Sequence, residues 1–194
     1  PLARLRGLTS DTARFVGGHP MAGREVSGPG GARADLFEDR LWVITGNAGA
    51  EPRRVDDVRW LAKQCGSLIV ELDAAEHDRA VALTSHTPQI LASVLAAQLV
   101  SADPSDVAVS GQGLRDATRL ADSGPDLWSQ IIASKAPEII AVLDKIGVDL
   151  AEIREALAEV SVVPDAELTD AIDPVRRLLE RGNDGRRTLP DKHG

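Results

Sequence analysis

The segment LWVIT at residues 41–45 is a short, continuous apolar stretch, and together with its surroundings it decides the fold class. Arg40 precedes it and the pair Gly46-Asn47 follows it, which is typical of a buried strand. A helix is predicted next, because apolar residues recur at helical spacing from Val55 onward and Gly66 provides a stop.

A second apolar run, SLIVEL at 67–72, predicts another strand. Strands that alternate with a helix are typical of a parallel sheet. Upstream, residues 14–16 lead into a predicted glycine-rich turn at Gly17-Gly18. Residues 1–72 are therefore expected to form an α/β domain.

Residues 73–182 are expected to be entirely helical. Asp73 and Glu76 have the spacing of a capping box, which predicts a helix start. This helix is expected to run to about residue 100 with a kink at Pro88, because proline removes a backbone hydrogen bond. Residues 90–100 are apolar almost all round, so we expect a second subunit to cover them.

Proline and glycine mark the later helices. Pro125 and Pro137 suit first helical turns, whereas Gly147 and Gly182 are interpreted as helix ends. Residues 183–194 are polar and rich in glycine and arginine, which predicts a loop or linker. The chain should be mostly α overall.

The composition excludes several classes of function. A net charge of −8 argues against nucleic acid as a partner, because phosphate binding needs a basic surface. Cys65 is the single cysteine, so there is no internal disulfide or cysteine-based zinc site, and we expect a reducing cytoplasm. We expect no apolar run to approach the roughly 20 residues that are needed to span a bilayer, so no membrane partner is expected.

The densest motif is GGHPMAGRE at residues 17–25. A histidine at a strand end, beside glycines and a proline, lies where α/β enzymes build their sites. His19 titrates near neutral pH and can accept a hydroxyl proton. From spacing alone, this reading and a histidine that only satisfies a turn have equal weight.

His86 and Gln89 are three residues apart and share a helix face. His77 lies nine residues before His86, about half a turn out of phase, so no metal site is expected there. On geometry alone, a buried polar pair at the kink is favoured over a catalytic pair.

The third cluster is Gly111-Gln112-Gly113 with two arginines. Arg115 and Arg119 would face the same way on a helix, and a guanidinium suits a carboxylate ligand. On the evidence of this cluster alone, a solvated helix start with Asp116 as the ion-pair partner is favoured over a carboxylate-binding site. The Gly-x-Gly is no dinucleotide fingerprint, because Asp116 occupies the third glycine position.

Taken in order, these motifs resemble the prephenate/arogenate dehydrogenase family of tyrosine biosynthesis. The resemblance rests on GGHPMAG at 17–23, LWVIT at 41–45, SHTP at 85–88, GLRDATRLA at 113–121 and PDLW at 125–128. It implies part of a Rossmann-like nucleotide-binding domain over residues 1–72. An all-helical dimerisation domain, like the C-terminal domain of 6-phosphogluconate dehydrogenase, is implied over residues 73–182. A homodimer follows from that domain.

The implied reaction is oxidative decarboxylation of prephenate or arogenate, with hydride transfer to NAD or NADP. His19 matches the family's catalytic histidine, which hydrogen-bonds the ring hydroxyl. Arg119 matches an arginine that binds a substrate carboxylate. Glu25, His86 and Arg115 match polar positions that line or gate the pocket.

The sequence departs from the family pattern in two ways. Gln89 replaces a histidine that the family often has. We expect its neutral amide to bind the substrate side chain and to favour arogenate over prephenate. The family's Gly-x-Gly-x-x-Gly loop and its catalytic serine are not in this chain, so the cofactor-binding residues are unassigned. If these residues were the whole molecule, we would expect it to be inactive.

Two alternatives remain open. The chain could be a catalytically inactive dimerisation module, or part of another dehydrogenase that shares the helical domain. A 3-hydroxyacid enzyme would need a lysine near the kink, and residues 74–100 contain none.

Overall fold

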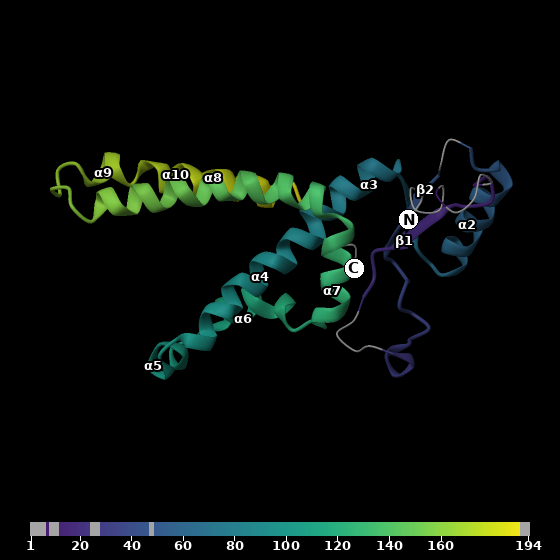
Figure 1. Ribbon diagram of the computed structural model, residues 1–194, viewed down its shortest axis with the longest axis horizontal. Helices are drawn as coiled ribbons and strands as arrows, with labels where there is room; N and C mark the ends of the chain where they lie inside the picture. Colours follow the sequence, from purple (N-terminus) through teal and green to yellow (C-terminus); the bar gives the residue numbers. More distant parts are fainter. Residues whose placement is uncertain (1–6, 8–11, 24–27, 47–48, 191–194) are drawn as a thin grey trace. The chain divides into compact units, whose positions relative to one another are not determined.

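The computed structural model describes residue 7 and residues 12–23, 28–46 and 49–190. The chain divides into two compact units, Pro1–Ala136 and Pro137–Gly194, and each is considered by itself (Figure 1). The predicted domain limits at residues 72 and 182 remain predictions.

A three-stranded sheet opens the first unit, with strand order β1-β2-β3. β2 (Leu41–Thr45) and β3 (Leu68–Glu71) are parallel and are connected through α2 (Pro52–Gln64), as the sequence predicted. β1 (Gly17–Pro20) pairs antiparallel with β2. The predicted turn at residues 17–18 is wrong, because these glycines lie inside β1 and pair with β2.

The two glycines of β1 are explained by what lies opposite them. A Cβ atom at Gly18 would come within 2.9 Å of Trp42 Nε1, and one at Gly17 would collide with Thr45 Oγ1. Glycine therefore serves here for close packing and not for a turn. Gly66 has the role that the sequence predicted, since its φ of 72° ends α2 in the left-handed region.

The core of the α/β part lies between the sheet and α2. Trp42, Ile44 and Ala62 are buried there, and the Trp42 ring centroid lies 5.4 Å from that of Phe37. The remaining apolar side chains packed against this cluster are Val16, Val55, Val58, Cys65 and Ile69.

A long helical segment follows β3. α3 (Ala74–Val81) begins with the predicted capping box of Asp73 and Glu76. A π-helical turn, η2 (Ala82–His86), separates α3 from α4 (Thr87–Gln98). The Thr87 N–H bonds to the carbonyl of Ala82, five residues back, directly before Pro88, which has no N–H to donate. The irregularity expected at Pro88 thus takes the form of a π-turn that ends just before it.

Short helices complete the first unit. They are η3 (Leu99–Ser101), α5 (Pro104–Ala108), α6 (Gln112–Thr118), η4 (Arg119–Ala121) and α7 (Pro125–Ser134), with η1 (Pro29–Gly31) earlier in the chain. Both α6 and η4 pack against α4. Pro125 occupies the first turn of α7, as predicted.

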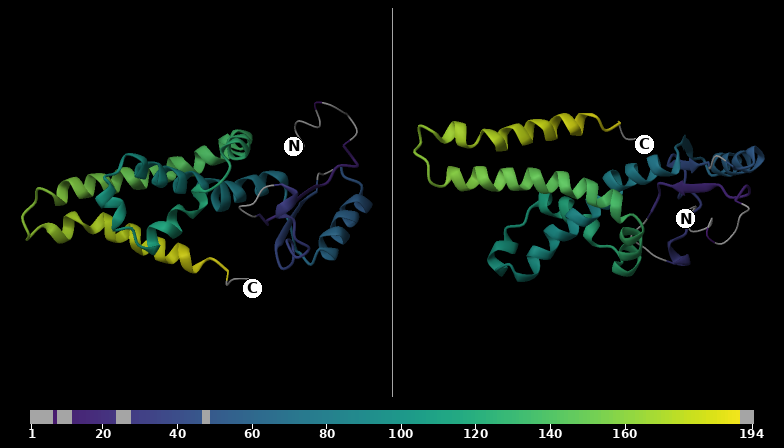
Figure 2. Two further views of the ribbon diagram at one scale, coloured as in Figure 1. Left: turned by 90° about the horizontal axis from the view of Figure 1, so that it is seen from below. Right: turned by 45° about the horizontal axis from the view of Figure 1, so that its top comes forward.

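The second unit contains most of α8 (Ala136–Val160), followed by α9 (Leu168–Ala171) and α10 (Asp173–Arg187). α8 and α10 run in opposite directions (Figure 2), and Arg181 of α10 donates to Asp149 of α8 at 2.7 Å. The predicted helix ends at Gly147 and Gly182 are wrong. Both glycines lie within these helices, although an interior glycine costs a helix about 1 kcal/mol relative to alanine.

The helical segment Ala74–Ser101 is long and apolar enough to cross a bilayer by length and composition, with a mean hydropathy of 1.2 in its most apolar window. The expectation that no run approaches this length is therefore wrong. The finding is weak evidence for a membrane, since core helices of soluble proteins meet the same criterion.

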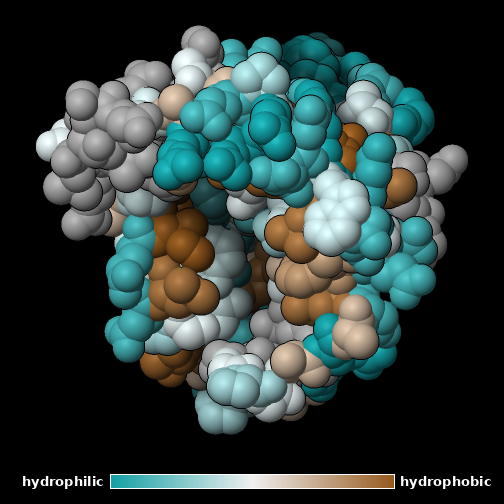
Figure 3. All heavy atoms as spheres, turned by 90° about the vertical axis from the view of Figure 1, so that its right-hand side faces the viewer, coloured by the Kyte–Doolittle hydropathy of each residue, from teal (hydrophilic) through white to brown (hydrophobic). Residues whose placement is uncertain are grey.

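The surface retains apolar side chains. Hydrophobic patches alternate with hydrophilic surface on the face shown in Figure 3. In the long helical segment, Leu83 is 60% exposed and Val94 is 55% exposed. Such residues indicate surfaces that a partner can cover.

We expect Gly18→Ala to lower the free energy of unfolding by about 1–3 kcal/mol, because the new methyl group must displace the buried Trp42 indole. Gly23→Ala is the matched control, since its Cβ would meet nothing within 4 Å. Denaturant unfolding of both variants measures the difference. Equal losses in the two variants would contradict the packing role of Gly18.

Candidate active site

His19 lies in β1 opposite Val43, where its side chain remains partly accessible to solvent. Its Nδ1 atom is 2.8 Å from Nε2 of His77, and the two rings meet edge to face with centroids 5.1 Å apart. The strand and the helix that follows β3 thus bring together two histidines that are 58 residues apart in sequence.

His77 is the first member of a line of polar contacts. It belongs to the first turn of α3, and its Nδ1 is 2.9 Å from Oδ1 of Asp78. The other oxygen of Asp78 is 2.5 Å from Nζ of Lys135, at the end of α7. The side chains of His77, Asp78 and Lys135 are only 13%, 25% and 14% exposed. Polar and charged groups that are largely withdrawn from water need partners, and here they have them.

The surroundings favour neutral imidazole at His19. Partial burial lowers the pKa of His19 first, and the nearby His77, His86 and Lys135 lower it further. For Asp78, burial alone would raise the pKa, but hydrogen bonds from Lys135 and His77 outweigh it and the pKa is lowered. At neutral pH the cluster therefore contains a neutral His19 beside an ionised Asp78.

His86 is buried at the end of the π-turn. Its ring lies edge-on to Trp128 of α7, with centroids 6.2 Å apart. Burial is the main cause that lowers the pKa of His86, and the nearby Lys135 and His77 lower it further. Nδ1 of His86 and Oγ1 of Thr87 have no hydrogen-bond partner within the described part of the chain. Buried polar atoms without partners are unusual, so a ligand can satisfy them.

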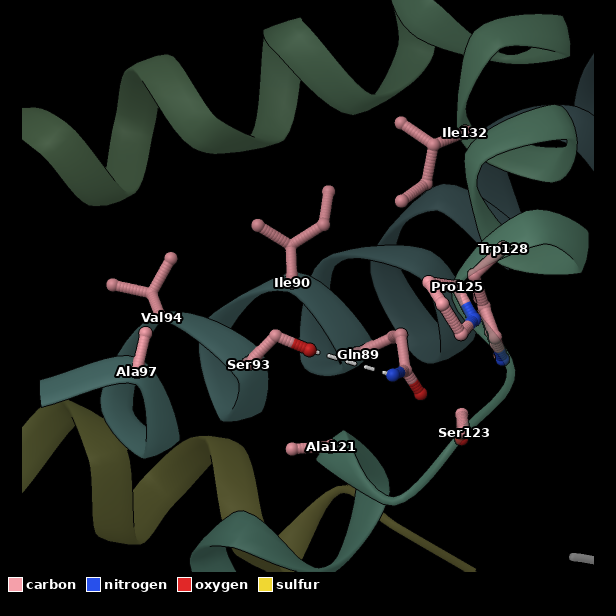
Figure 4. Close-up of a pocket in the computed structure, with 10 residues that line it drawn as sticks. All are labelled: Gln89, Ile90, Ser93, Val94, Ala97, Ala121, Ser123, Pro125, Trp128 and Ile132. Atoms are coloured by element: carbon pink, nitrogen blue, oxygen red, sulfur yellow. Dashed lines mark hydrogen bonds between the residues drawn. The ribbon is translucent and has the colours of Figure 1, made fainter. Parts of the chain in front are cut away.

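A pocket of about 380 Å³ opens beside this region (Figure 4). Gln89 contributes its polar amide, and its Nε2 is 3.5 Å from Oγ of Ser93, at the limit of a hydrogen bond. The other lining residues are Ile90, Val94, Ala97, Ala121, Ser123, Pro125, Trp128 and Ile132. An apolar wall with a few amide and hydroxyl groups suits a small organic ligand.

The predicted arginines lie on α6 and η4, and both are exposed. Asp116 accepts from Gln112 at 2.9 Å, and neither Arg115 nor Arg119 forms an ion pair with any described residue. The interpretation of Asp116 as their partner is therefore wrong. Two uncompensated guanidinium groups remain available for an anion.

The other predicted positions are placed as follows. Glu25 lies outside the described residues. Met21, Ala22 and Gly23 of the histidine motif line a polar hollow, in which Arg33 pairs with Asp35 at 2.6 Å. The roles predicted for the six site residues remain predictions.

Sequence reasoning missed His77, Asp78, Lys135 and Trp128. In a regular α-helix, the spacing of nine residues separates His77 from His86, so helical periodicity gives no reason to place His77 in the site. The available signal was its place immediately after a parallel strand, where the first turn of the next helix faces the end of the sheet.

The first turn of α2 is unsuited to a pyrophosphate group. Glu51 directly precedes α2, and its carboxylate lies 3.4 Å from Nε of Arg54 without capping the helix. Pro52 offers no N–H at the first helical position. A carboxylate and a missing donor both oppose phosphate. Nor do three metal-ligating side chains cluster anywhere in the described ranges.

The lowered histidine pKa values predict how stability depends on pH. Because His19 and His86 titrate below their ordinary 6.5 in the folded chain, the unfolded chain binds more protons in this range. The free energy of unfolding should therefore decrease as the pH falls below about 6.5.

Denaturant unfolding at about pH 7.5 and about pH 5 measures this decrease, and it should be smaller in His86→Gln. The carboxyl of Asp78 does not interfere, because its pKa lies below the ordinary 3.8. Stability that rises as the pH falls would contradict the assignment.

Two family models match the chain. Residues 2–71 match the prephenate dehydrogenase nucleotide-binding domain, and residues 73–168 match the prephenate dehydrogenase dimerization domain. The chain therefore contains a nucleotide-binding region followed by a dimerisation domain.

Curated relatives agree with these models. "Probable prephenate dehydrogenase NovF" of Streptomyces niveus is 35% identical over 192 residues, covering 98% of this chain and 52% of the relative. The cyclohexadienyl dehydrogenase of Zymomonas mobilis is 33% identical over 148 residues, covering 74% of this chain and 50% of the relative. The chain thus spans about half the length of these relatives.

Solved structures share the fold. The arogenate dehydrogenase of Synechocystis superposes with a TM-score of 0.70 at 24% identity, covering 91% of this chain and 62% of that one. The prephenate dehydrogenase of Aquifex aeolicus, in complex with hydroxyphenyl propionate and NAD+, gives 0.70 at 24% identity, covering 88% and 59%. With both family models and a relative of 35% identity in agreement, this chain belongs to the prephenate dehydrogenase family.

Proposed function

We propose that the protein containing this chain oxidises and decarboxylates prephenate or arogenate, and that this chain supplies the hydrogen-bonding histidine and the helical part of the substrate site. The observation that carries the proposal is the accessible, neutral His19 held against His77 at 2.8 Å. The nucleotide, when bound, supplies the acceptor for the hydride.

His19 has the properties that the reaction needs. A neutral imidazole with one nitrogen engaged by His77 keeps its second nitrogen for the ring hydroxyl of the substrate. Accepting that hydrogen bond stabilises the carbonyl character that develops as hydride leaves the hydroxyl-bearing carbon. Loss of the ring carboxylate as carbon dioxide then yields the aromatic ring. The product keeps its ring hydroxyl, so His19 undergoes no net change in protonation.

The substrate is a dianion, or its amino analogue, and the helical part offers groups of matching chemistry. Arg119 and Arg115 are the free guanidinium groups proposed to bind its carboxylates. Gln89, in the pocket near His86, is proposed to contact the side chain of the substrate. Its neutral amide can accept from the ammonium group of arogenate or donate to the keto acid of prephenate.

NAD or NADP is the proposed cofactor. Support comes from the nucleotide-binding family model over residues 2–71 and from the Aquifex aeolicus relative, which binds NAD+. Because the first turn of α2 is unsuited to phosphate, the proposal assigns no phosphate contact to it.

A homodimer is the proposed assembly. The dimerisation family model spans residues 73–168, which include α4. On α4, Val94 is 55% exposed and Leu95 is 41% exposed, although this helix is apolar almost all round. A second copy that covers α4 would remove this apolar surface from water.

The proposed function is tested by His19→Ala in the complete protein, with prephenate and arogenate as substrates and reduction of the nicotinamide as the signal. Loss of a positioned hydrogen-bonding group should lower kcat by about 10²–10⁴. The melting temperature should change little, since His19 is partly accessible. Turnover within a few-fold of the parent protein on both substrates would exclude the proposed role.

Arg119→Ala should raise KM about 10- to 100-fold with little change in kcat, because a carboxylate contact acts on substrate and transition state alike. Arg53→Ala is the matched control, since Arg53 is an exposed arginine on α2. Steady-state kinetics of both variants decide the point. If KM is the same in the two variants, Arg119 does not bind the substrate.

A further inference from the structure

We propose that Asp78, acting through His77, fixes the tautomer of His19 so that its Nε2 lone pair faces the substrate. His77 and Asp78 are then positioning residues, and Lys135 sets the orientation of Asp78. The benefit to turnover rests on the proposed function of His19, whereas the tautomer itself does not.

The argument begins with the contacts. His19 Nδ1 is 2.8 Å from His77 Nε2, and His77 Nδ1 is 2.9 Å from Asp78 Oδ1. Asp78 Oδ2 is 2.5 Å from Lys135 Nζ. Each atom in this line faces one partner, so the donors and acceptors can be assigned in order.

An ionised carboxylate has only acceptors, so His77 Nδ1 must carry the proton that is directed at Asp78. Neutral His77 has a single N–H, and its Nε2 is therefore an acceptor. His19 Nδ1 must then be the donor in the contact with His77. The proton of neutral His19 is thus on Nδ1, and Nε2 is left with a free lone pair.

The opposite assignment fails at two places. A proton on His77 Nε2 would leave its Nδ1 lone pair facing Asp78 Oδ1 at 2.9 Å, with no hydrogen between two acceptors. It would also force the proton of His19 onto Nε2, and the substrate hydroxyl would then meet a donor. Doubly protonated His77 would also direct a donor at His19, so the tautomers are assigned for the neutral rings.

Local contacts restrain the three positioning groups. The capping box of Asp73 and Glu76 fixes the start of α3, where His77 and Asp78 lie. Lys135 ends α7 and is 14% exposed, so its ammonium cannot swing freely into solvent. The orienting carboxylate is therefore anchored from two helices, as in other sites in which a second group orients a catalytic histidine.

Asp78→Asn is the decisive variant. An ammonium has only donors, so the new amide must direct its carbonyl oxygen toward Lys135. Its NH₂ group then faces His77 Nδ1 and requires a lone pair there. The proton of His77 moves to Nε2, and the proton of His19 moves from Nδ1 to Nε2. The variant should therefore invert both tautomers while the shape of the side chain is kept.

Long-range ¹H–¹⁵N NMR of the full 194-residue chain, above the histidine pKa values, reports which nitrogen carries each proton. We expect Nδ1–H on His19 and on His77 in the parent chain, and Nε2–H on both in Asp78→Asn. A merely structural role of Asp78 would change stability without exchanging the protons. The inference is overturned if His19 carries its proton on Nε2 in the parent chain, or if Asp78→Asn leaves it on Nδ1.

Kinetics of the complete protein give the second readout. Asp78→Asn should lower kcat about 10- to 100-fold with KM little changed, as expected when a histidine is held in the wrong tautomer. Asp57→Asn is the matched control, because Asp57 is 67% exposed on α2. His77→Gln keeps an acceptor amide for His19 and should lose less kcat than His77→Leu. Equal losses in these two His77 variants would contradict the acceptor role.

The two proposals fail in distinguishable ways. If Asp78→Asn exchanges the protons but His19→Ala retains turnover, the tautomer assignment stands and the proposed function fails. If His19→Ala removes turnover but Asp78→Asn leaves the protons in place, the proposed function stands and the positioning role fails.

Discussion

The contact between His19 and His77 joins the sheet to the helical part of the first unit, and the properties of the site depend on it. One end of the line of contacts is a strand residue that is accessible to a ligand. The other end is a charged pair, Asp78 and Lys135, which is largely withdrawn from water. A carboxylate withdrawn from water is costly unless it is paired, so Asp78 must keep its contact with Lys135. This contact fixes the orientation of the carboxylate. That geometry determines which nitrogen of His19 is free to meet a substrate.

The π-turn before Pro88 provides the second constraint. In a regular α-helix, His77 and His86 would lie about half a turn out of phase. The wider π-turn at residues 82–86 changes the phase of everything beyond it, and in the folded chain each histidine is close enough to affect its neighbours electrostatically. A π-turn within an α-helix is often found at functional sites. Here it presents His86 to Trp128 and turns Gln89 toward the adjoining pocket.

Membership of the family and the hydrogen-bonding pattern around His19 support the proposed function independently. The family models assign a nucleotide-binding region and a dimerisation domain. The donor and acceptor pattern around His19 comes from contacts within this chain alone. The helix α10 lies entirely beyond the residues that match the dimerisation model, and two of its arginines pair with acidic residues of α8. These exposed pairs are typical of a solvated helix surface and add little stability individually.

The sequence by itself determined the strands at residues 41–45 and 68–71, the capping box at Asp73 and the first-turn prolines, because each depends on neighbours within a few residues. It also indicated the family, since several spaced motifs occur in order. It misjudged Gly147 and Gly182, which lie within α8 and α10 although glycine disfavours helix interiors. It also misjudged Gly17-Gly18, whose role depends on Trp42 and Thr45 across the sheet.

Only the tertiary structure brought His77, Asp78 and Lys135 to His19. These residues come from a strand, the start of one helix and the end of another, and no spacing in the sequence encodes that meeting. Helical periodicity placed His77 away from His86, and the π-turn altered the phase on which that expectation relied. The tautomer of a histidine depends on its partners in space, and for that reason it had to come from the folded chain.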